Sequence, residues 1–297
     1  ETNIIISRIE RWCNRLPAMF VEDEQLLSAE YSWSKDPIPF ASRLEKKYRK
    51  IIQGVSWAKE WESSWFHLKG KIKKEWTGKI IVADLDFSGE GLVYDPKGNE
   101  IQGITNASIW DPNFVRTRVI LPKNCINKND VELWVEAAAN SLFGIYLDPD
   151  PEQDNPKRHG SFDAKVEKMV IGIFRKDIWD LYLDARILYG LIETLDEKSI
   201  RRARIINTMD KTIIAFKDDT KDAESARKIL NPELSKRASS SDLKVAAVGH
   251  AHIDTGWLWP VRETIRKCAR TFSTQLNLID KYPDYIFGAS MPQHYQF

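Results

Sequence analysis

The hydrophobic period of the sequence changes several times along the chain, which excludes a fold built from one kind of layer. Between Ser64 and Arg175, short runs with strand-type composition alternate with turn residues. From Lys176 onward apolar residues recur at helical spacing, and near residue 245 a strand-like run returns. We therefore expect a mixed α and β, multidomain chain, as its length of 297 residues also favours.

Residues 64–175 predict an antiparallel β-sandwich of jelly-roll type. In IIVADLDF, Ile81, Ala83, Leu85 and Phe87 fall on one face, because side chains alternate between the faces of a strand. Several short strands of this kind, separated by glycine-containing turns, are typical of sandwiches. Such a domain either binds sugar or braces a neighbouring domain, and we expect bracing.

Helical patterns flank this sandwich. Residues 1–63 are expected to form a helical or irregular segment, which begins with an amphipathic helix ended by Pro17. Residues 176–240 predict a helical connector that closes with the polar linker RASSSD. The first connector helix carries a broad apolar stripe formed by Ile178, Leu181, Tyr182, Ala185, Leu188, Tyr189 and Ile192.

Residues 241–297 predict the beginning of a parallel α/β domain. KVAAVGHAHID is typical of a buried strand, RETIRKCARTFSTQLNLIDKYP of a helix, and YIFGAS of a second strand. We expect Arg266 and Lys267 to lie on a solvated helix face, and Glu263 in the first turn, where the helix dipole favours a carboxylate. The residues expected to point inward are Ile265, Cys268, Phe272, Leu276 and Ile279.

Composition excludes some classes of partner. The chain has 44 basic and 43 acidic residues, so its net charge of +1 predicts neither a nucleic-acid nor a membrane-surface partner. No run of 18 apolar residues and no signal peptide is evident. Cys13, Cys125 and Cys268 are far apart and odd in number, which favours a reducing compartment and hence a cytoplasmic location.

The stretch VAAVGHAHIDTGWLWP, residues 245–260, contains the main candidate site. His250, His252 and Asp254 follow an apolar run at a spacing of two, so they begin on one face where the strand ends. Ligands of open α/β sheets usually bind at the carboxyl ends of strands. Imidazole and carboxylate groups suit Zn²⁺ or a similar divalent ion. The alternative is that these side chains only cap a buried strand through hydrogen bonds.

The bare HxHxD pattern also occurs in other metal hydrolases. Metallo-β-lactamase-like enzymes continue it with a histidine, where this chain has Thr255. Amidohydrolases carry HxH near the start of their domain. A complete site of another kind would have to recruit His67, His159 or His294, and none of these lies in a ligand motif.

The longer string GHAHIDTGWLWPVRETIRKCARTFSTQL closely resembles the start of the catalytic domain of glycoside hydrolase family 38, the α-mannosidases, and most of all their cytosolic and bacterial branch. YPDYIFGASMPQHYQF resembles the next stretch of that branch, although Gln296 and Phe297 replace the usual Glu and Trp. SSWFHLKGKI, DFSGEGLVYDPKGNEIQGIT and VELWVEAAANSLFG resemble its N-terminal β-domain, and WDLYLDARILYGLIETL its helical connector. The resemblance spans most of residues 60–297.

The resemblance implies a retaining, metal-dependent hydrolase that removes terminal α-linked mannose from oligosaccharides. It implies that His252 and Asp254 bind a divalent ion, usually zinc, with His250 either a ligand or a supporting residue. Trp257 corresponds to a tryptophan of the sugar pocket, so substrate binding is implied, with core packing as the alternative. Trp259 is expected to face the core.

The family's nucleophile lies later in the sequence, so the resemblance places it beyond Phe297 and implies no catalytic residue in this chain. We therefore expect the 297 residues alone to be inactive. A homo-oligomer is left open. The alternative function, from another class, is a carbohydrate-binding or scaffold module built on the β-sandwich.

Overall fold

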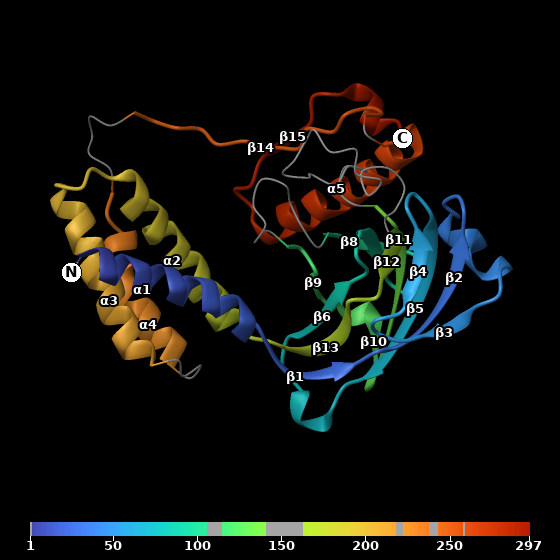
Figure 1. Ribbon diagram of the computed structural model, residues 1–297, viewed down its shortest axis with the longest axis horizontal. Coiled ribbons are helices and arrows are strands. Elements are labelled where there is room, and N and C mark those ends of the chain that lie inside the picture. Colours follow the sequence, from blue (N-terminus) through green and yellow to red (C-terminus); the bar gives the residue numbers. More distant parts are fainter. Residues whose placement is uncertain (1, 106–114, 141–162, 218–221, 238–242, 258) are drawn as a thin grey trace, which may run out of the picture. The chain divides into compact units, whose positions relative to one another are not determined.

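The described residues of the computed structural model form two compact units (Figure 1). The first unit comprises Glu1–Asp23 and Ile173–Val245, and the second comprises Glu24–Gly172 and Ala246–Phe297. The predicted combination of helices, antiparallel sandwich and parallel strand pair is confirmed, whereas the domain boundaries at 63, 175 and 240 stay predictions. The structure describes residues 2–105, 115–140, 163–217, 222–237, 243–257 and 259–297.

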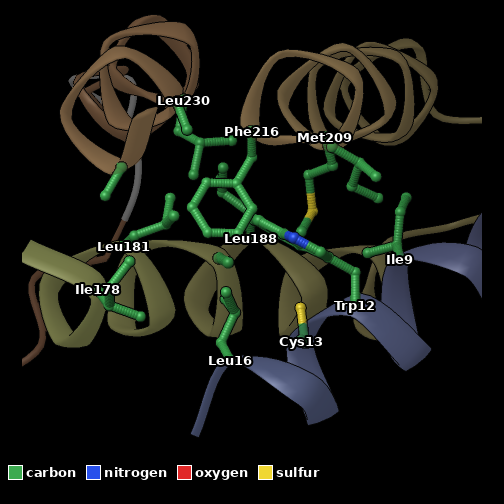
Figure 2. Close-up of a cluster of buried hydrophobic side chains, with 14 of the residues drawn as sticks. Ile9, Trp12, Cys13, Leu16, Ile178, Leu181, Leu188, Met209, Phe216 and Leu230 are labelled. Atoms are coloured by element: carbon green, nitrogen blue, oxygen red, sulfur yellow. The ribbon is translucent and has the colours of Figure 1, made fainter. Parts of the chain in front are cut away.

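The first unit is a helical bundle around one apolar core (Figure 2). Its helices are α1 (Thr2–Arg15), α2 (Lys176–Thr194), α3 (Ile200–Phe216) and α4 (Ala223–Leu234). As predicted, Pro17 follows the end of α1, in a short 3₁₀ helix at Leu16–Met19. The predicted stripe of α2 faces the core, where five of its residues are buried and the two tyrosines are partly buried.

Side chains from α1 complete this core. Trp12 lies edge-to-face with Phe216 of α3, with ring centroids 6.0 Å apart. Burial raises the pKa of the neighbouring Cys13 thiol to about 12, so the group stays protonated and packs as a small apolar side chain. Within the part of the chain that the structure describes, no helix has the length and apolar character needed to cross a bilayer.

The second unit contains the β-sandwich. One sheet has the strand order β3-β2-β5-β11-β7-β8, with β10 paired to β11, and the other has the order β1-β13-β6-β9. β4 and β12 form a separate antiparallel pair. The strands span β1 (Val21–Leu26), β2 (Ser28–Ser34), β3 (Arg49–Ile51), β4 (Ser56–Lys59), β5 (Ser63–Lys71), β6 (Ile81–Asp86), β7 (Glu90–Tyr94), β8 (Glu100–Thr105), β9 (Arg118–Ile120), β10 (Ile126–Asn127), β11 (Asp130–Ala138), β12 (Asp163–Lys165) and β13 (Lys168–Phe174).

The strands begin earlier in the sequence than expected. β1 to β4 lie within residues 1–63, which we expected to be helical or irregular. β1 has the polar sequence VEDEQL, and it is a strand because it pairs with β13, not because of its own propensity. In β6 the predicted face is buried, but Val82 and Asp84 of the opposite face are buried as well.

The last segment has the predicted order of strand, helix and strand. β14 (Gly249–His250) and β15 (Phe287–Gly288) pair in parallel, and α5 (Val261–Lys281) connects them. The prediction of a buried strand before His250 is wrong, because residues 243–248 belong to no strand or helix, and Leu243 is 93 % exposed. A parallel strand is buried only when neighbouring strands and helices cover it, and the described residues supply a single two-residue partner.

Helix α5 lies against the sandwich through its polar face, which is the reverse of the predicted orientation. Of the five residues expected inward, only Cys268 is buried, while Leu276 is 63 % exposed. The helix approaches β8 so closely that a Cβ on Gly103 would come within 2.8 Å of the Arg270 carbonyl oxygen. The buried residues of α5 are Glu263, Thr264, Arg266, Cys268, Arg270, Ser273 and Thr274.

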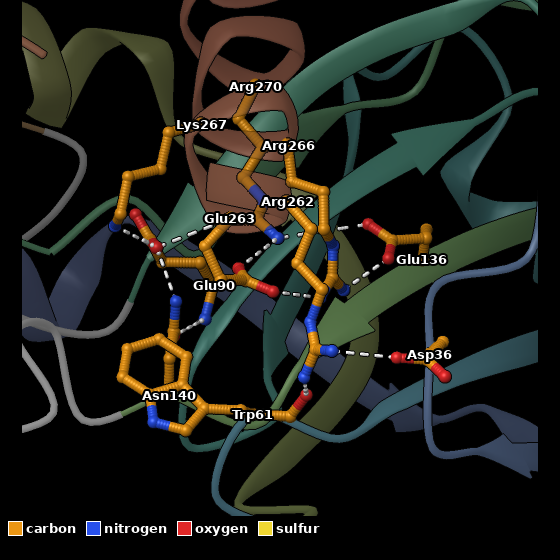
Figure 3. Close-up of polar contacts among 10 residues, drawn as sticks. All are labelled: Asp36, Trp61, Glu90, Glu136, Asn140, Arg262, Glu263, Arg266, Lys267 and Arg270. Atoms are coloured by element: carbon orange, nitrogen blue, oxygen red, sulfur yellow. Dashed lines mark hydrogen bonds and ion pairs between the residues drawn. The ribbon is translucent and has the colours of Figure 1, made fainter. Parts of the chain in front are cut away.

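A cluster of six charged residues, which we call the α5 ion cluster, joins this polar face to the sandwich (Figure 3). The cluster consists of Glu90 of β7, Glu136 of β11, and Glu263, Arg266, Lys267 and Arg270 of α5. Its three carboxylates balance its three cations. The prediction that Arg266 and Lys267 lie on a solvated face is therefore wrong, since their side chains are 7 % and 12 % exposed.

Short contacts connect the members of the α5 ion cluster. Arg266 pairs with Glu136, and its Nη1 lies 2.5 Å from Glu263 Oε1. Glu90 Oε2 lies 2.5 Å from Lys267 Nζ and 3.2 Å from Arg270 Nη1. Removing one member of such a buried set costs about 3–5 kcal/mol, because the opposite charge stays buried without its partner. The cluster therefore specifies which face of α5 meets the sandwich.

The electrostatics of Glu90 show the strength of this coupling. Burial by itself would raise the pKa of Glu90, but Lys267 and Arg270 lower it to about 2. Asn140 adds a hydrogen bond from its Nδ2 to Glu90 Oε2 at 2.6 Å. The carboxylate therefore stays charged at every pH at which most proteins remain folded.

We expect the stability of the second unit to fall as the pH falls from about 4.5 towards about 2. The folded pKa of Glu90 lies below its unfolded value, so its contribution is complete above the unfolded pKa and is lost as the pH falls through the folded pKa. Glu90→Gln should lower the free energy of unfolding near pH 7 by about 3 kcal/mol and weaken this pH dependence. Urea unfolding across the pH range measures both effects.

Glu24→Gln is the matched control, because Glu24 pairs with Lys168 with 40 % of its side chain exposed. Its effect should stay below about 1 kcal/mol. A Glu90→Gln protein as stable as wild type, with an unchanged pH profile, would contradict the assigned coupling.

Candidate metal and sugar site

The candidate site lies where β14 ends and the chain turns into α5. β14 stops at His250, so His252 and Asp254 follow the strand and do not belong to it. Gly256 has φ +72°, a left-handed conformation that glycine adopts without a Cβ clash. The chain reverses at this glycine, and α5 begins at Val261.

The structure brings the two predicted metal ligands together. His252 Nε2 lies 3.2 Å from Asp254 Oδ1, and the side chains are 77 % and 41 % exposed. An ion bound tetrahedrally about 2.1 Å from each atom would hold these atoms about 3.4 Å apart. Imidazole nitrogen and carboxylate oxygen are both ligands of Zn²⁺. In spacing and in chemistry the pair therefore fits a shared divalent ion.

His250 does not contact this pair. Its Nε2 lies 3.4 Å from Ser290 Oγ, a residue that follows β15. A side chain held by a neighbouring strand end is suited to supporting the site. Both roles that we considered for His250, ligand and supporting residue, stay predictions.

The two tryptophans of the motif differ in exposure. Trp257 is 55 % exposed, and its ring lies edge-on to Trp259, with centroids 5.4 Å apart. Trp259 is 9 % exposed and lies under Lys267 Nζ, 4.6 Å from the ring centroid. The core position expected for Trp259 is thus observed, and an exposed aromatic ring remains at Trp257.

Thr264 organises the turn, although no sequence motif singled it out. Its Oγ1 accepts hydrogen bonds from Gly256 N at 2.9 Å and Trp259 Nε1 at 3.1 Å, and donates to the Asp254 carbonyl oxygen at 3.1 Å. A threonine in a first helical turn gives no sequence signal of this kind, because its partners are backbone atoms and an indole brought together by the fold.

Two of the other histidines, His67 and His294, have partners of their own. His67 of β5 lies 2.7 Å from Glu132 Oε1 and stacks on Trp134, and burial lowers its pKa. His294 Nε2 lies 2.8 Å from Thr255 Oγ1. His159 lies outside the described residues. Among the residues that the structure describes, no group of three or more His, Cys, Asp or Glu side chains is placed to hold a metal ion.

Comparison with known families identifies two parts of the chain. The α-mannosidase jelly roll domain matches residues 25–167. The N-terminal domain of glycosyl hydrolases family 38 matches residues 242–297. The first range contains most strands of the sandwich but not β13 or the start of β1, and the second contains the candidate site.

Curated relatives agree with these matches. Alpha-mannosidase 2C1 of Mus musculus is 27 % identical over 88 % of this chain, and alpha-mannosidase G of Dictyostelium discoideum is 27 % identical over 93 %. An alpha-mannosidase of Saccharomyces cerevisiae is 28 % identical over 90 %. The matches cover 24 %, 25 % and 25 % of these relatives, so this chain spans about a quarter of their length.

The two family models follow each other in the same order as the sandwich and the candidate site. All three relatives are α-mannosidases aligned along most of the chain. Along most of its length the chain therefore resembles the α-mannosidases of glycoside hydrolase family 38.

Proposed function

We propose that this chain is the N-terminal part of a retaining, metal-dependent α-mannosidase that hydrolyses terminal α-linked mannose from oligosaccharides. The observation that carries the proposal is the exposed His252–Asp254 pair, placed within the range matched by the family 38 domain. The pair lies at the carboxyl end of β14, where ligands of parallel sheets bind. The proposal places the nucleophile beyond Phe297.

In this proposal His252 and Asp254 hold a divalent ion, with zinc as the expected metal. The ion would supply positive charge to bind neighbouring hydroxyl groups of the sugar ring and stabilise charge that develops there. The residues of this chain contribute orientation: Thr264 holds the backbone of Asp254, and the α5 ion cluster holds the helix that carries Thr264.

Trp257 is the proposed sugar-binding residue. Trp257 follows the metal-ligand pair closely in the sequence. Its ring is half exposed and lies edge-on to the buried Trp259. An aromatic face covers the apolar C–H face of a pyranose, and two rotatable bonds limit the entropy lost on binding. The exposed ring would therefore help to orient the mannose.

The sandwich acts as a scaffold in this proposal. Glu90 and Glu136, both on sandwich strands, hold three cations of α5, which is an observation that favours bracing over an independent function. The free and buried Cys13, Cys125 and Cys268 support a reducing, cytoplasmic environment. Cell fractionation would test this location, and recovery in a secreted fraction would contradict it.

His252→Ala and Asp254→Asn should each lower bound zinc and reduce kcat/KM at least about 100-fold in an active α-mannosidase that contains this sequence. The reason is that each variant removes one ion ligand. Elemental analysis of the purified protein and hydrolysis of an aryl α-mannoside measure the two effects. His67→Gln, in the sandwich, is the control and should retain both zinc and activity. Full activity after His252→Ala would rule out the proposed ligand role.

Trp257→Ala should raise KM for mannosides about tenfold while zinc content stays at the wild-type level, because the variant removes apolar contact with the sugar. Trp257→Phe keeps an aromatic face and should restore most of the affinity. Steady-state kinetics on the same enzyme separate the two variants. An unchanged KM in Trp257→Ala would show that the ring serves packing alone.

The isolated 297-residue chain should not hydrolyse an aryl α-mannoside, with or without added zinc. Retaining hydrolysis needs two carboxyl groups at the scissile bond, and the proposal places the nucleophile beyond Phe297. The measurement is release of the aryl alcohol by chain whose folding has been verified by circular dichroism. Hydrolysis that disappears in His252→Ala would show that the nucleophile lies within these residues.

A further inference from the structure

Thr264 uses its whole hydrogen-bonding capacity on the turn that carries Asp254 and Trp257. A threonine hydroxyl has one donor and two acceptor positions. Here it donates to the Asp254 carbonyl oxygen and accepts from Gly256 N and from Trp259 Nε1, at 2.9–3.1 Å. One hydroxyl therefore ties three points of the turn to the first part of α5.

The neighbours of Thr264 on α5 hold it in position through buried ion pairs. Thr264 is fully buried, it follows Glu263 directly, and it precedes Arg266 by two residues. Glu263 and Arg266 pair with each other, and Arg266 pairs with Glu136 of β11. Thr264 thus connects the turn to α5, and buried charges hold α5 against the sandwich.

We propose that Thr264 is a positioning residue that sets the place of Asp254 and Trp257, and hence the geometry of the divalent-ion and sugar site. This inference rests on the proposed function. Thr264 acts through the turn, since its hydroxyl contacts the backbone of Asp254 while the carboxylate of Asp254 points to His252.

The physical need for such a residue follows from the geometry of the turn. His252 and Asp254 lie after the end of β14, so no strand partner holds them. Gly256, at φ +72°, adds the conformational freedom of glycine just beyond the carboxylate. Ligand groups must be held close to the bound geometry if an ion is to bind tightly. The three hydrogen bonds of Thr264 supply that restraint.

The test compares three variants of the 297-residue chain. Thr264→Val keeps the shape of the side chain and removes all three hydrogen bonds. Thr264→Ser keeps the hydroxyl. Thr274→Val is the matched control, because Thr274 is also buried on α5 and its hydroxyl accepts from Gly103 N at 3.0 Å, away from the turn.

The first readout is hydrogen exchange at the amide of Gly256, measured by NMR. In the wild type this amide should exchange about 100-fold more slowly than in an unstructured peptide, and Thr264→Val should remove most of that protection. Thr264→Ser and Thr274→Val should keep it. This readout needs neither metal nor activity. An unprotected Gly256 amide in the wild type would overturn the inference, even if Thr264→Val does not fold.

The second readout is the affinity for zinc, titrated as the chloride and followed at the ring resonances of His252, with His252→Ala to subtract binding elsewhere. Thr264→Val should weaken binding about 10- to 100-fold, and Thr264→Ser should restore it. Zinc affinity equal to wild type in Thr264→Val would overturn the positioning role. Absence of zinc binding in the wild-type chain would show that the pair needs further ligands from the rest of the protein, and hydrogen exchange then decides the inference alone.

Discussion

The buried ion pairs between α5 and the sandwich are the interaction on which the arrangement of the second unit depends. Glu90 and Glu136 belong to strands of one sheet, and their partners Arg266, Lys267 and Arg270 belong to a helix more than a hundred residues later. Charges buried in this way add little net stability when complete, but an incomplete set costs several kcal/mol. Their main effect is therefore to exclude other orientations of the helix.

The orientation of α5 also determines where its first turn meets the candidate site. Glu263 takes part in the α5 ion cluster, and the next residue, Thr264, forms hydrogen bonds with the turn. Adjacent residues of α5 therefore contact the sandwich charges and the candidate site. The sandwich, the helix and the His252–Asp254 pair form a continuous chain of contacts through described residues. A jelly roll that binds no ligand of its own would still contribute to the candidate site in this way.

The sequence predicted best those features that depend on local periodicity and on a specific motif. The stripe of α2, the start of α5 and the core position of Trp259 are all observed, because apolar spacing and proline positions act locally. The closeness of His252 and Asp254 also follows from their spacing. β1 was missed because its polar sequence forms a strand only through pairing with β13.

The face of α5 was predicted wrongly for a physical reason. Its apolar residues Ile265, Leu276 and Ile279 are exposed, whereas the sandwich offers carboxylates to the opposite side of the helix. The sequence by itself determined the classes of element, the resemblance to a family and the candidate ligands, since these depend on local spacing and on a motif. Only the tertiary structure decided which charges are buried and which hydroxyl holds the turn. The ion pairs join α5 to strands more than a hundred residues earlier, and Thr264 meets backbone atoms and an indole that the turn brings to it. Hydrophobic spacing carries no information about either kind of contact.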